Sequence, residues 1–339
     1  MPGYNFLPAP VWLITALHVL TLTLHFLAMN FLLGGIIIIL WGRIGDRWNN
    51  PVVKKFIRLF PTVMAVTVTL GVAPLLFLQL VFHRQVYAAS IVSGWFWLMI
   101  VAAVIASYYL LYATSFSQKA SSSTRRWFLV LSLVGLSYVA FVYSSVFSMT
   151  ERPDLYTALY AGVQSGTIIN PNLGDYGLRW LHMIVGAATV GGFFVGLLGR
   201  NDESAFKIGK QFFLWGTIAN AVLGIAYLLT LGDILRPFMR SAGIWFLTAG
   251  IVLAFASLHF FFRRRFVISG GMVLVTMLMM VLSRHYVRLL NLAPHYDPAT
   301  MPIQPQWSVF ALFLISFLAA LAVVWYMLRL YFRGKRVAA

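Results

Sequence analysis

Nine long apolar runs constrain this chain more than any other feature of its sequence. In the hydrocarbon of a bilayer every backbone polar group must be paired within the protein, which restricts spanning segments to helices and closed barrels. Barrel strands alternate apolar and polar residues, whereas these runs are continuously apolar and reach the roughly 20 residues that a spanning helix needs. The sequence therefore predicts an all-α integral membrane protein with nine transmembrane helices, over approximately residues 10–42, 56–82, 86–114, 126–149, 177–199, 208–231, 237–262, 266–291 and 306–332.

The composition agrees with a membrane protein and excludes several other classes. Hydrophobic residues make up 61% of the chain and charged residues 10%, where about 25% charged is usual for a soluble domain. The net charge of +17 is also found in nucleic-acid-binding proteins, but here the basic residues lie at the ends of apolar runs, where they indicate topology. We therefore expect membrane lipids as partners and no nucleic acid. Because cysteine is absent, iron–sulfur clusters and covalently attached c-type haem are excluded, and any haem would be held by His or Met.

Basic residues are distributed unevenly between the two sets of run ends. Of the 25 Lys and Arg residues, 18 lie at one set of ends and seven at the other. The positive-inside rule makes the richer side cytoplasmic, with the N-terminus outside and the C-terminus in the cytoplasm of a prokaryotic inner membrane. The seven outer residues are all arginines, which either extend to the lipid head groups or pair with an anionic cofactor: Arg84, Arg152, Arg179, Arg236, Arg240, Arg284 and Arg288.

The longest connection between the runs divides the chain. Residues 150–176 are rich in Pro, Gly, Asn, Asp and Thr, which predicts an ordered outer loop. This loop separates a first four-helix membrane bundle, residues 1–149, from a second one, residues 177–291, which is followed by a ninth peripheral helix and a basic cytoplasmic tail, residues 292–339. No internal sequence repeat is strong enough to be assigned.

Histidines gather toward the predicted outer side. His18 and His25 lie in the first run, His182 lies in the fifth, and His285 lies near the end of the eighth. A single intramembrane histidine is often a packing residue, but several in one leaflet favour a function, because polar groups in hydrocarbon are costly. His18 and His25 are seven residues apart, so that they share a helix face and are separated by about 10.5 Å along the axis.

Carboxylates show the opposite pattern. No predicted span contains a buried acid, whereas proton-coupled transporters usually place Asp or Glu in the membrane. This argues against a proton-driven transporter. All eight acids lie in predicted loops: Asp46, Glu151, Asp154, Asp175, Asp202, Glu203, Asp233 and Asp297.

Two further features bear on a haem site. Small residues line the fifth run from Gly186 to Gly196, which predicts either close helix packing or room for a flat macrocycle next to His182. Met239 is predicted to begin the seventh span, between Arg236 and Arg240 and at about the depth of His182. His and Met together are a known axial pair for haem iron.

Three short pieces of the sequence, together with the position of Arg284, are similar to a known family. They are His25-Phe26-Leu27 with Leu32-Leu33-Gly34, then Leu70-Gly71-Val72-Ala73 with Gln79, Tyr87 and Ser90, and Arg179-Trp180-Leu181-His182 with Gly186, Gly191 and Gly192. In these pieces the chain resembles the haem-bearing subunit I of cytochrome bd quinol oxidases. The resemblance implies nine spans arranged as two four-helix bundles plus one, with His25 as ligand of a high-spin haem and His182 as ligand of a low-spin b haem.

The chain also departs from the family pattern. The third run, Gly94 to Thr114, lacks the two glutamates of the family, and Val281 stands where the family has a glutamate near the end of the eighth span. The long quinol-binding loop shrinks to about Gly232–Pro237, and strict register for the family's Met ligand gives Ala242 rather than Met239. These departures favour an electron conduit over an oxygen-reducing enzyme.

The resemblance implies a b-haem membrane subunit with two or more haem b groups. It would carry electrons between membrane quinol and an outer-side acceptor, such as a c-type cytochrome or a partner subunit. His182 would ligate one haem, opposite Met239 or another histidine, and His25 would ligate a second haem, with His18 or His285 near it. Two alternatives remain open, an oxygen-reducing quinol oxidase subunit and a haem-free transporter or membrane anchor. The haem propionates would be neutralised by Arg179, Arg236, Arg240, Arg284 and Arg288.

Overall fold

The computed structural model describes residues 6–44, 47–117 and 121–337, without the side chains of residues 324, 328 and 331–337. Asp46, Lys119 and the side chains of the basic tail residues Arg333, Lys335 and Arg336 lie outside this description. Within the described part, nine helices are long and apolar enough to cross a membrane, and no strand is present. The prediction of an all-α membrane protein is confirmed at this level.

The long helices follow one another with short connections. They are α1 (Val11–Trp41), α2 (Pro51–Val81), α4 (Gly94–Phe116), α5 (Ser122–Met149), α7 (Leu173–Leu198), α8 (Glu203–Leu229), α10 (Ala242–Phe262), α11 (Phe266–Leu292) and α12 (Trp307–Val337). The shorter elements are α3 (His83–Val92), α6 (Pro153–Gly162), η1 (Gly232–Ile234), α9 (Leu235–Arg240) and η2 (Pro298–Thr300).

Two predicted spans begin later than expected. The third begins at Gly94 rather than at residue 86, because Ser93 separates it from α3 and donates a hydrogen bond to the backbone oxygen of Ile168 at 2.6 Å. The seventh begins at Ala242 rather than at residue 237, because Ser241 is extended and caps the new helix by accepting a hydrogen bond from Gly243 N at 3.1 Å. Met239 therefore belongs to the separate short helix α9.

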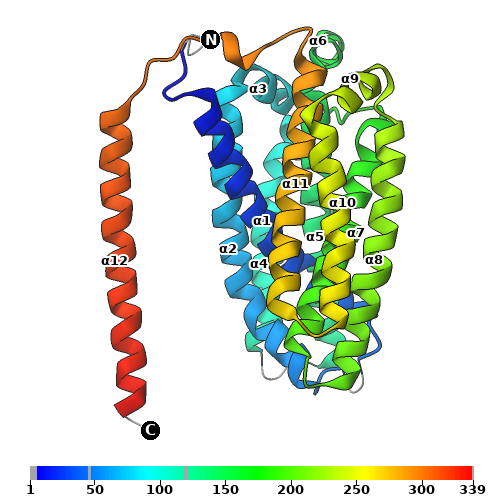
Figure 1. Ribbon diagram of the computed structural model, residues 1–339, viewed down its shortest axis with the longest axis vertical. Coiled ribbons are helices and arrows are strands. Elements are labelled where there is room, and N and C mark those ends of the chain that lie inside the picture. Colours follow the sequence, from blue (N-terminus) through cyan, green and yellow to red (C-terminus); the bar gives the residue numbers. More distant parts are fainter. Residues whose placement is uncertain (1–5, 45–46, 118–120, 338–339) are drawn as a thin grey trace. The chain divides into compact units, whose positions relative to one another are not determined.

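The described chain forms two compact units, of which Thr15–Asp297 is the larger. In this unit the neighbouring helices α4 and α5, α7 and α8, and α10 and α11 pack against each other along the bundle, and α5 also packs on α7 (Figure 1). The short helices α3, α6 and α9 gather at one end of the bundle (Figure 1). Of these, α6 lies within the segment predicted as an outer loop, and its first turn begins with Pro153 and Asp154. The division into two four-helix bundles stays a prediction.

The smaller unit joins the N-terminal segment to the last helix. Leu7 N donates a hydrogen bond to Pro302 O at 2.8 Å, and Gln304 N donates to Leu7 O at 2.9 Å. The described side chains of α12 are exposed and mostly apolar, as is appropriate for a helix that contacts lipid.

In the larger unit, α1 and α7 approach each other at two glycines. A Cβ atom built on Gly34 would lie 1.9 Å from Ala187 O, and one built on Gly191 would lie 2.6 Å from the Cα of Gly34. Gly192 faces the backbone of α8 in the same way, and Gly196 faces the ring of Phe261. These glycines allow close helix packing, which is the first of the two interpretations of this small-residue stripe.

We expect Gly34→Ala to destabilise the protein, because the added methyl group would overlap the backbone of α7. Overpacking of this kind costs about 1–3 kcal/mol. Thermal unfolding of the purified protein in detergent measures the effect. Gly271→Ala is the matched control, because a Cβ there meets nothing within 4 Å, and equal unfolding temperatures for the two variants would contradict the close contact.

Candidate functional site

Two histidines of α1 make the same contact with α2. His18 Nδ1 lies 2.9 Å from the backbone oxygen of Pro74, and His25 Nδ1 lies 2.9 Å from that of Thr67. Since a carbonyl oxygen can only accept, Nδ1 is the donor in both rings. In a neutral imidazole this leaves a lone pair on Nε2, which is free to bind a metal.

The ring of His25 also fills a space that a glycine leaves open. A Cβ atom on Gly71 would lie 2.8 Å from His25 Cε1 and 2.9 Å from His25 Nδ1. The ring is therefore fixed on one side by the carbonyl of Thr67 and on another by the bare backbone at Gly71. Gly71 was part of the family resemblance, but its contact with His25 was not foreseen.

His182 of α7 lies against α8 in a related way. A Cβ atom on Gly224 would lie 3.4 Å from His182 Cε1 and 3.7 Å from Nδ1. His182 Nδ1 is buried, lies beside the backbone of Asn220, and has no hydrogen-bond partner of acceptable geometry. The Asn220 amide, in the orientation that satisfies both of its polar atoms, donates to His182 O at 2.9 Å and accepts from Gly186 N at 3.2 Å.

The remaining candidate ligands have different surroundings. His285 of α11 is near enough to His18 to interact with it electrostatically, and its Nδ1 is buried without a hydrogen-bond partner. Met239 is 51% exposed on α9, where Phe238 is the buried residue. Arg236 and Arg240 are likewise exposed on α9. The structure therefore places His285 within electrostatic reach of His18 and leaves the α9 candidates on the surface of the larger unit.

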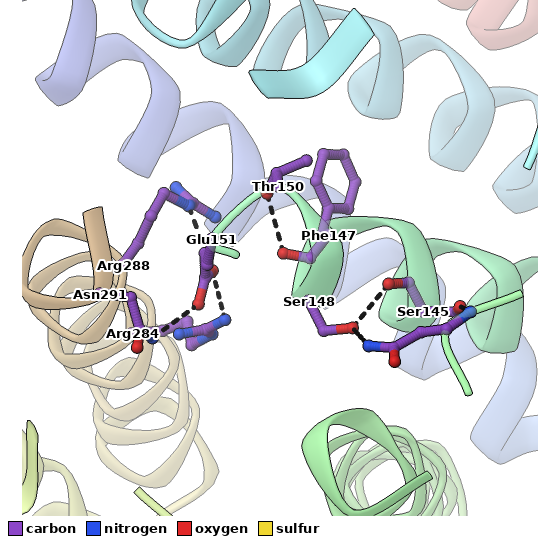
Figure 2. A network of polar contacts seen from close by, with 9 residues as sticks. Ser145, Phe147, Ser148, Thr150, Glu151, Arg284, Arg288 and Asn291 are labelled. Carbon is purple, nitrogen blue, oxygen red and sulfur yellow. Dashed lines mark hydrogen bonds and ion pairs between the residues drawn. The ribbon is translucent and has the colours of Figure 1, made fainter. Parts of the chain in front are cut away.

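A buried carboxylate is the main feature that the sequence analysis missed. Glu151 follows α5 and is only 4% exposed. It forms ion pairs with Arg284 and, at 3.6 Å, with Arg288 Nε, and it accepts a hydrogen bond from Asn291 Nδ2 at 3.1 Å. Figure 2 shows these three side chains of α11 turned toward Glu151. Its position in a connection between spans was predicted correctly, but its burial was not.

Burial alone would raise the pKa of the Glu151 carboxyl. The positive charges of Arg284, Arg179 and Arg288 have the larger combined effect and lower this pKa below its ordinary value. Glu151 is therefore ionised at neutral pH. Two of the arginines expected to face cofactor propionates, Arg284 and Arg288, thus have a carboxylate of the chain itself as a partner.

Local backbone geometry explains why Glu151 is buried. Arg152 N donates to Met149 O at 2.9 Å, so that the chain keeps winding past the end of α5 and turns Glu151 toward α11. Nearby, Asn170 Nδ2 donates to Ser148 Oγ at 2.8 Å, which fastens the segment around Asn170 to α5. The sequence did contain a signal for this burial. Glu151 directly follows an apolar run, on the side where every basic residue is an arginine.

Positive charge remains in excess around Glu151. Arg179 acts on the same carboxylate electrostatically, so that three guanidinium groups share one negative charge. Arg179 Nη1 and Arg284 Nε and Nη1 are buried without hydrogen-bond partners. A pocket of about 80 Å³ adjoins Glu151 and Arg284 and is also lined by Ser148, Tyr227 and Asn291. The surroundings suit a further anionic group.

Side chains alone do not build a metal-ion site in the described part of the chain, where no three His, Asp or Glu residues come together as ligands. Haem needs fewer ligands from the protein, because its macrocycle supplies four and the protein supplies one or two. Comparison of the sequence with models of known protein families and with curated proteins finds no match. The functional assignment therefore depends on the residues and their geometry.

We expect Glu151→Gln to destabilise the protein strongly. Removing one partner of a buried ion pair leaves the other charge without compensation, at a cost of about 3–5 kcal/mol. Asp154→Asn is the matched control, because the side chain of Asp154 is 91% exposed. Thermal unfolding in detergent at neutral pH should show a large decrease only for Glu151→Gln, and similar curves for both variants would contradict the role of Glu151.

The same residue predicts a pH dependence. Because the pKa of Glu151 is lowered on folding, its ionisation stabilises the folded state at neutral pH, and this stabilisation is lost as the pH falls below the ordinary range of a carboxyl group. Unfolding temperatures measured from pH 7 downward should therefore decrease more steeply for the unsubstituted protein than for Glu151→Gln. Parallel curves would show that another group causes the acid sensitivity.

Proposed function

We propose that this chain is a b-haem electron-transfer subunit of the membrane, of the cytochrome bd type, in which His25 and His182 each ligate a haem iron. The environment of His25 carries the proposal. Histidines that bind a metal usually donate their second ring N–H to a backbone carbonyl or a carboxylate, which orients the ring and increases its basicity. His25 makes this bond to Thr67 O and is held by Gly71, with Nε2 free.

The donor chemistry of the other candidates also fits haem. His182 has a buried ring nitrogen without a partner and lies against Gly224 of α8. His18 and His285 interact electrostatically with each other, and would supply a second ligand for the His25 haem or an additional site. When bound, haem iron exchanges one electron, at a potential that axial ligands, burial and hydrogen bonds adjust. The part of this chain would be to orient the rings and exclude water.

The arginines would set the charge of the site. The excess positive charge of Arg179, Arg284 and Arg288 over Glu151 would offset the negative propionates of haem. Arg236 and Arg240 are exposed, and would instead meet lipid head groups or an outer partner. Glu151 would hold Arg284 and Arg288 in place.

The orientation follows from the positive-inside rule. Arg200 and the arginines at 263–265 lie in the turns between α7 and α8 and between α10 and α11, at the helix ends opposite to α9. We propose that these turns face the cytoplasm of a prokaryotic cell and that α3, α6 and α9 face outward. Electrons would then pass between membrane quinol and an outer acceptor, such as a c-type cytochrome or a partner subunit.

An electron conduit is preferred to an oxygen-reducing enzyme. Helix α4 contains no acidic residue, and the apolar Val281 of α11 is buried. Carboxylates that the resemblance places at these positions in oxygen-reducing relatives are therefore missing.

A dithionite-reduced minus oxidised visible spectrum tests the proposal. We expect b-type bands that carbon monoxide does not shift, together with selective loss of one component in His182→Ala and of another in His25→Ala. His259→Ala is the control, because this histidine is exposed in the last turn of α10. A protein without a Soret band would reject the haem assignment in favour of a transporter or anchor, and a shift with carbon monoxide would favour oxygen reduction.

The orientation has its own test, because the chain contains no cysteine. Gln164→Cys, between α6 and α7, should react with a membrane-impermeant thiol reagent in intact cells. Asn201→Cys, between α7 and α8, should react only after permeabilisation. Both positions are exposed, and the reverse labelling pattern would invert the proposed orientation.

A further inference from the structure

The two candidate ligands occupy matching places in two helix pairs. In α1, His25 is followed after nine and ten residues by Gly34 and Gly35, and in α7, His182 is followed at the same distances by Gly191 and Gly192. The first glycines of the two pairs, Gly34 and Gly191, contact each other where α1 and α7 cross. Nine helical residues rise about 13.5 Å, so each histidine lies the same distance along its helix from the common crossing.

The second helix of each pair continues the match. The His25 ring contacts Gly71 of α2 and the backbone of Thr67, four residues earlier. The His182 ring contacts Gly224 of α8 and lies beside the backbone of Asn220, again four residues earlier. In both pairs the imidazole ring therefore packs against a glycine of the second helix and points toward the backbone of that helix one turn earlier.

The N-terminal caps of α2 and α8 also correspond to each other. Asn50 caps α2 by accepting a hydrogen bond from Val52 N, and Asp202 caps α8 by accepting one from Ala205 N. These two capping side chains bond to each other, Asn50 Nδ2 to Asp202 Oδ2 at 2.7 Å. The pairs α1–α2 and α7–α8 thus meet through equivalent residues at the glycine crossing and at the caps, as the halves of an internal repeat do.

The surroundings of His25 and His182 differ in how they hold the histidine. At His25 the ring itself is fixed, by a 2.9 Å hydrogen bond to Thr67 O and by Gly71, where a Cβ would approach to 2.8 Å. At His182 the ring has no such bond and Gly224 leaves room for a Cβ at 3.4 Å, but the Asn220 amide binds the backbone of the turn that carries the ring. One site is held through the side chain and the other through the main chain.

We infer that Gly71 and Asn220 are the positioning residues of two equivalent histidine sites, each acting on its own site alone. The inference rests on the proposed function of His25 and His182 as haem ligands. Gly71 keeps the His25 ring in contact with Thr67 O, and Asn220 keeps the His182 turn at a fixed distance from α8. Each residue then determines the spectrum and midpoint potential of one haem component.

The test compares variants of the purified full-length protein that carries its haem. Redox titration followed by visible spectra resolves the two components, and thermal unfolding reports stability separately. Gly71→Ala should shift or remove the His25 component and leave the His182 component unchanged. Gly224→Ala, the matched change in the other half, should leave both components in place, because its methyl group would make only ordinary contact with the ring.

Asn220 is tested with two variants. Asn220→Leu keeps the size but removes the amide and should shift the potential of the His182 component only. Asn220→Ser should lie nearer the unsubstituted protein, because a hydroxyl group can still donate to His182 O. If Gly71→Ala does not accumulate as folded protein, the two Asn220 variants test the inference by themselves. They show whether a positioning residue affects the haem component of its own site only.

A merely structural role predicts a different result. Both components would then change together with the unfolding temperature, or neither would change while the protein retains its haem, and either outcome would overturn the inference without affecting the proposed function. An unsubstituted protein that contains no haem would overturn both.

Discussion

The close contact between α1 and α7 at Gly34 and Gly191 is the constraint on which the larger unit depends. Apolar side chains give helices no strong reason to associate in lipid, so close packing of small residues contributes much of the attraction. Here the two backbones touch, because a Cβ on either glycine would overlap the other helix. The contact joins helices that are far apart in the sequence and places the histidines of both at the same distance from one crossing.

A second constraint acts at the end of the larger unit that carries α3, α6 and α9. Glu151 and Arg288 are buried there beside the partly buried Arg179 and Arg284, and the buried carboxylate is tolerable because the arginines compensate its charge. The ion pairs tie the end of α5 to the last turns of α11, which bear His285 and Arg288. The same polar group therefore holds the helix ends together, and its Arg288 also acts electrostatically on His18 and His285.

Much of the architecture was predictable, and the differences have local causes. Run lengths predicted nine long helices, whereas Ser93 and Ser241 moved two of the helix starts. Ser93 ends α3 and bonds to the backbone oxygen of Ile168, and Ser241 ends α9 and caps α10 with its side chain. Met239 was predicted to lie at the depth of His182 because the seventh span was expected to begin before it. The break at Ser241 instead places Met239 on α9, where about half of its side chain is exposed. His25 and His182 were identified as candidates because polar groups in hydrocarbon are costly and because both lie in the pieces that resemble the family, but the groups that orient them were not identified.

The sequence by itself determined the class of protein and the number of long helices that the described residues form, because a bilayer requires continuous apolar helices. Only the tertiary structure decided that Glu151 is buried, that His25 contacts Gly71, and that the α1–α2 and α7–α8 pairs match. These features depend on which helix faces meet. In lipid nearly all faces of a helix are apolar, so hydrophobic periodicity does not distinguish a face that packs on protein from one that contacts lipid. The contacts are specified by the shapes of a few small and polar residues, and these become visible only when the helices are brought together.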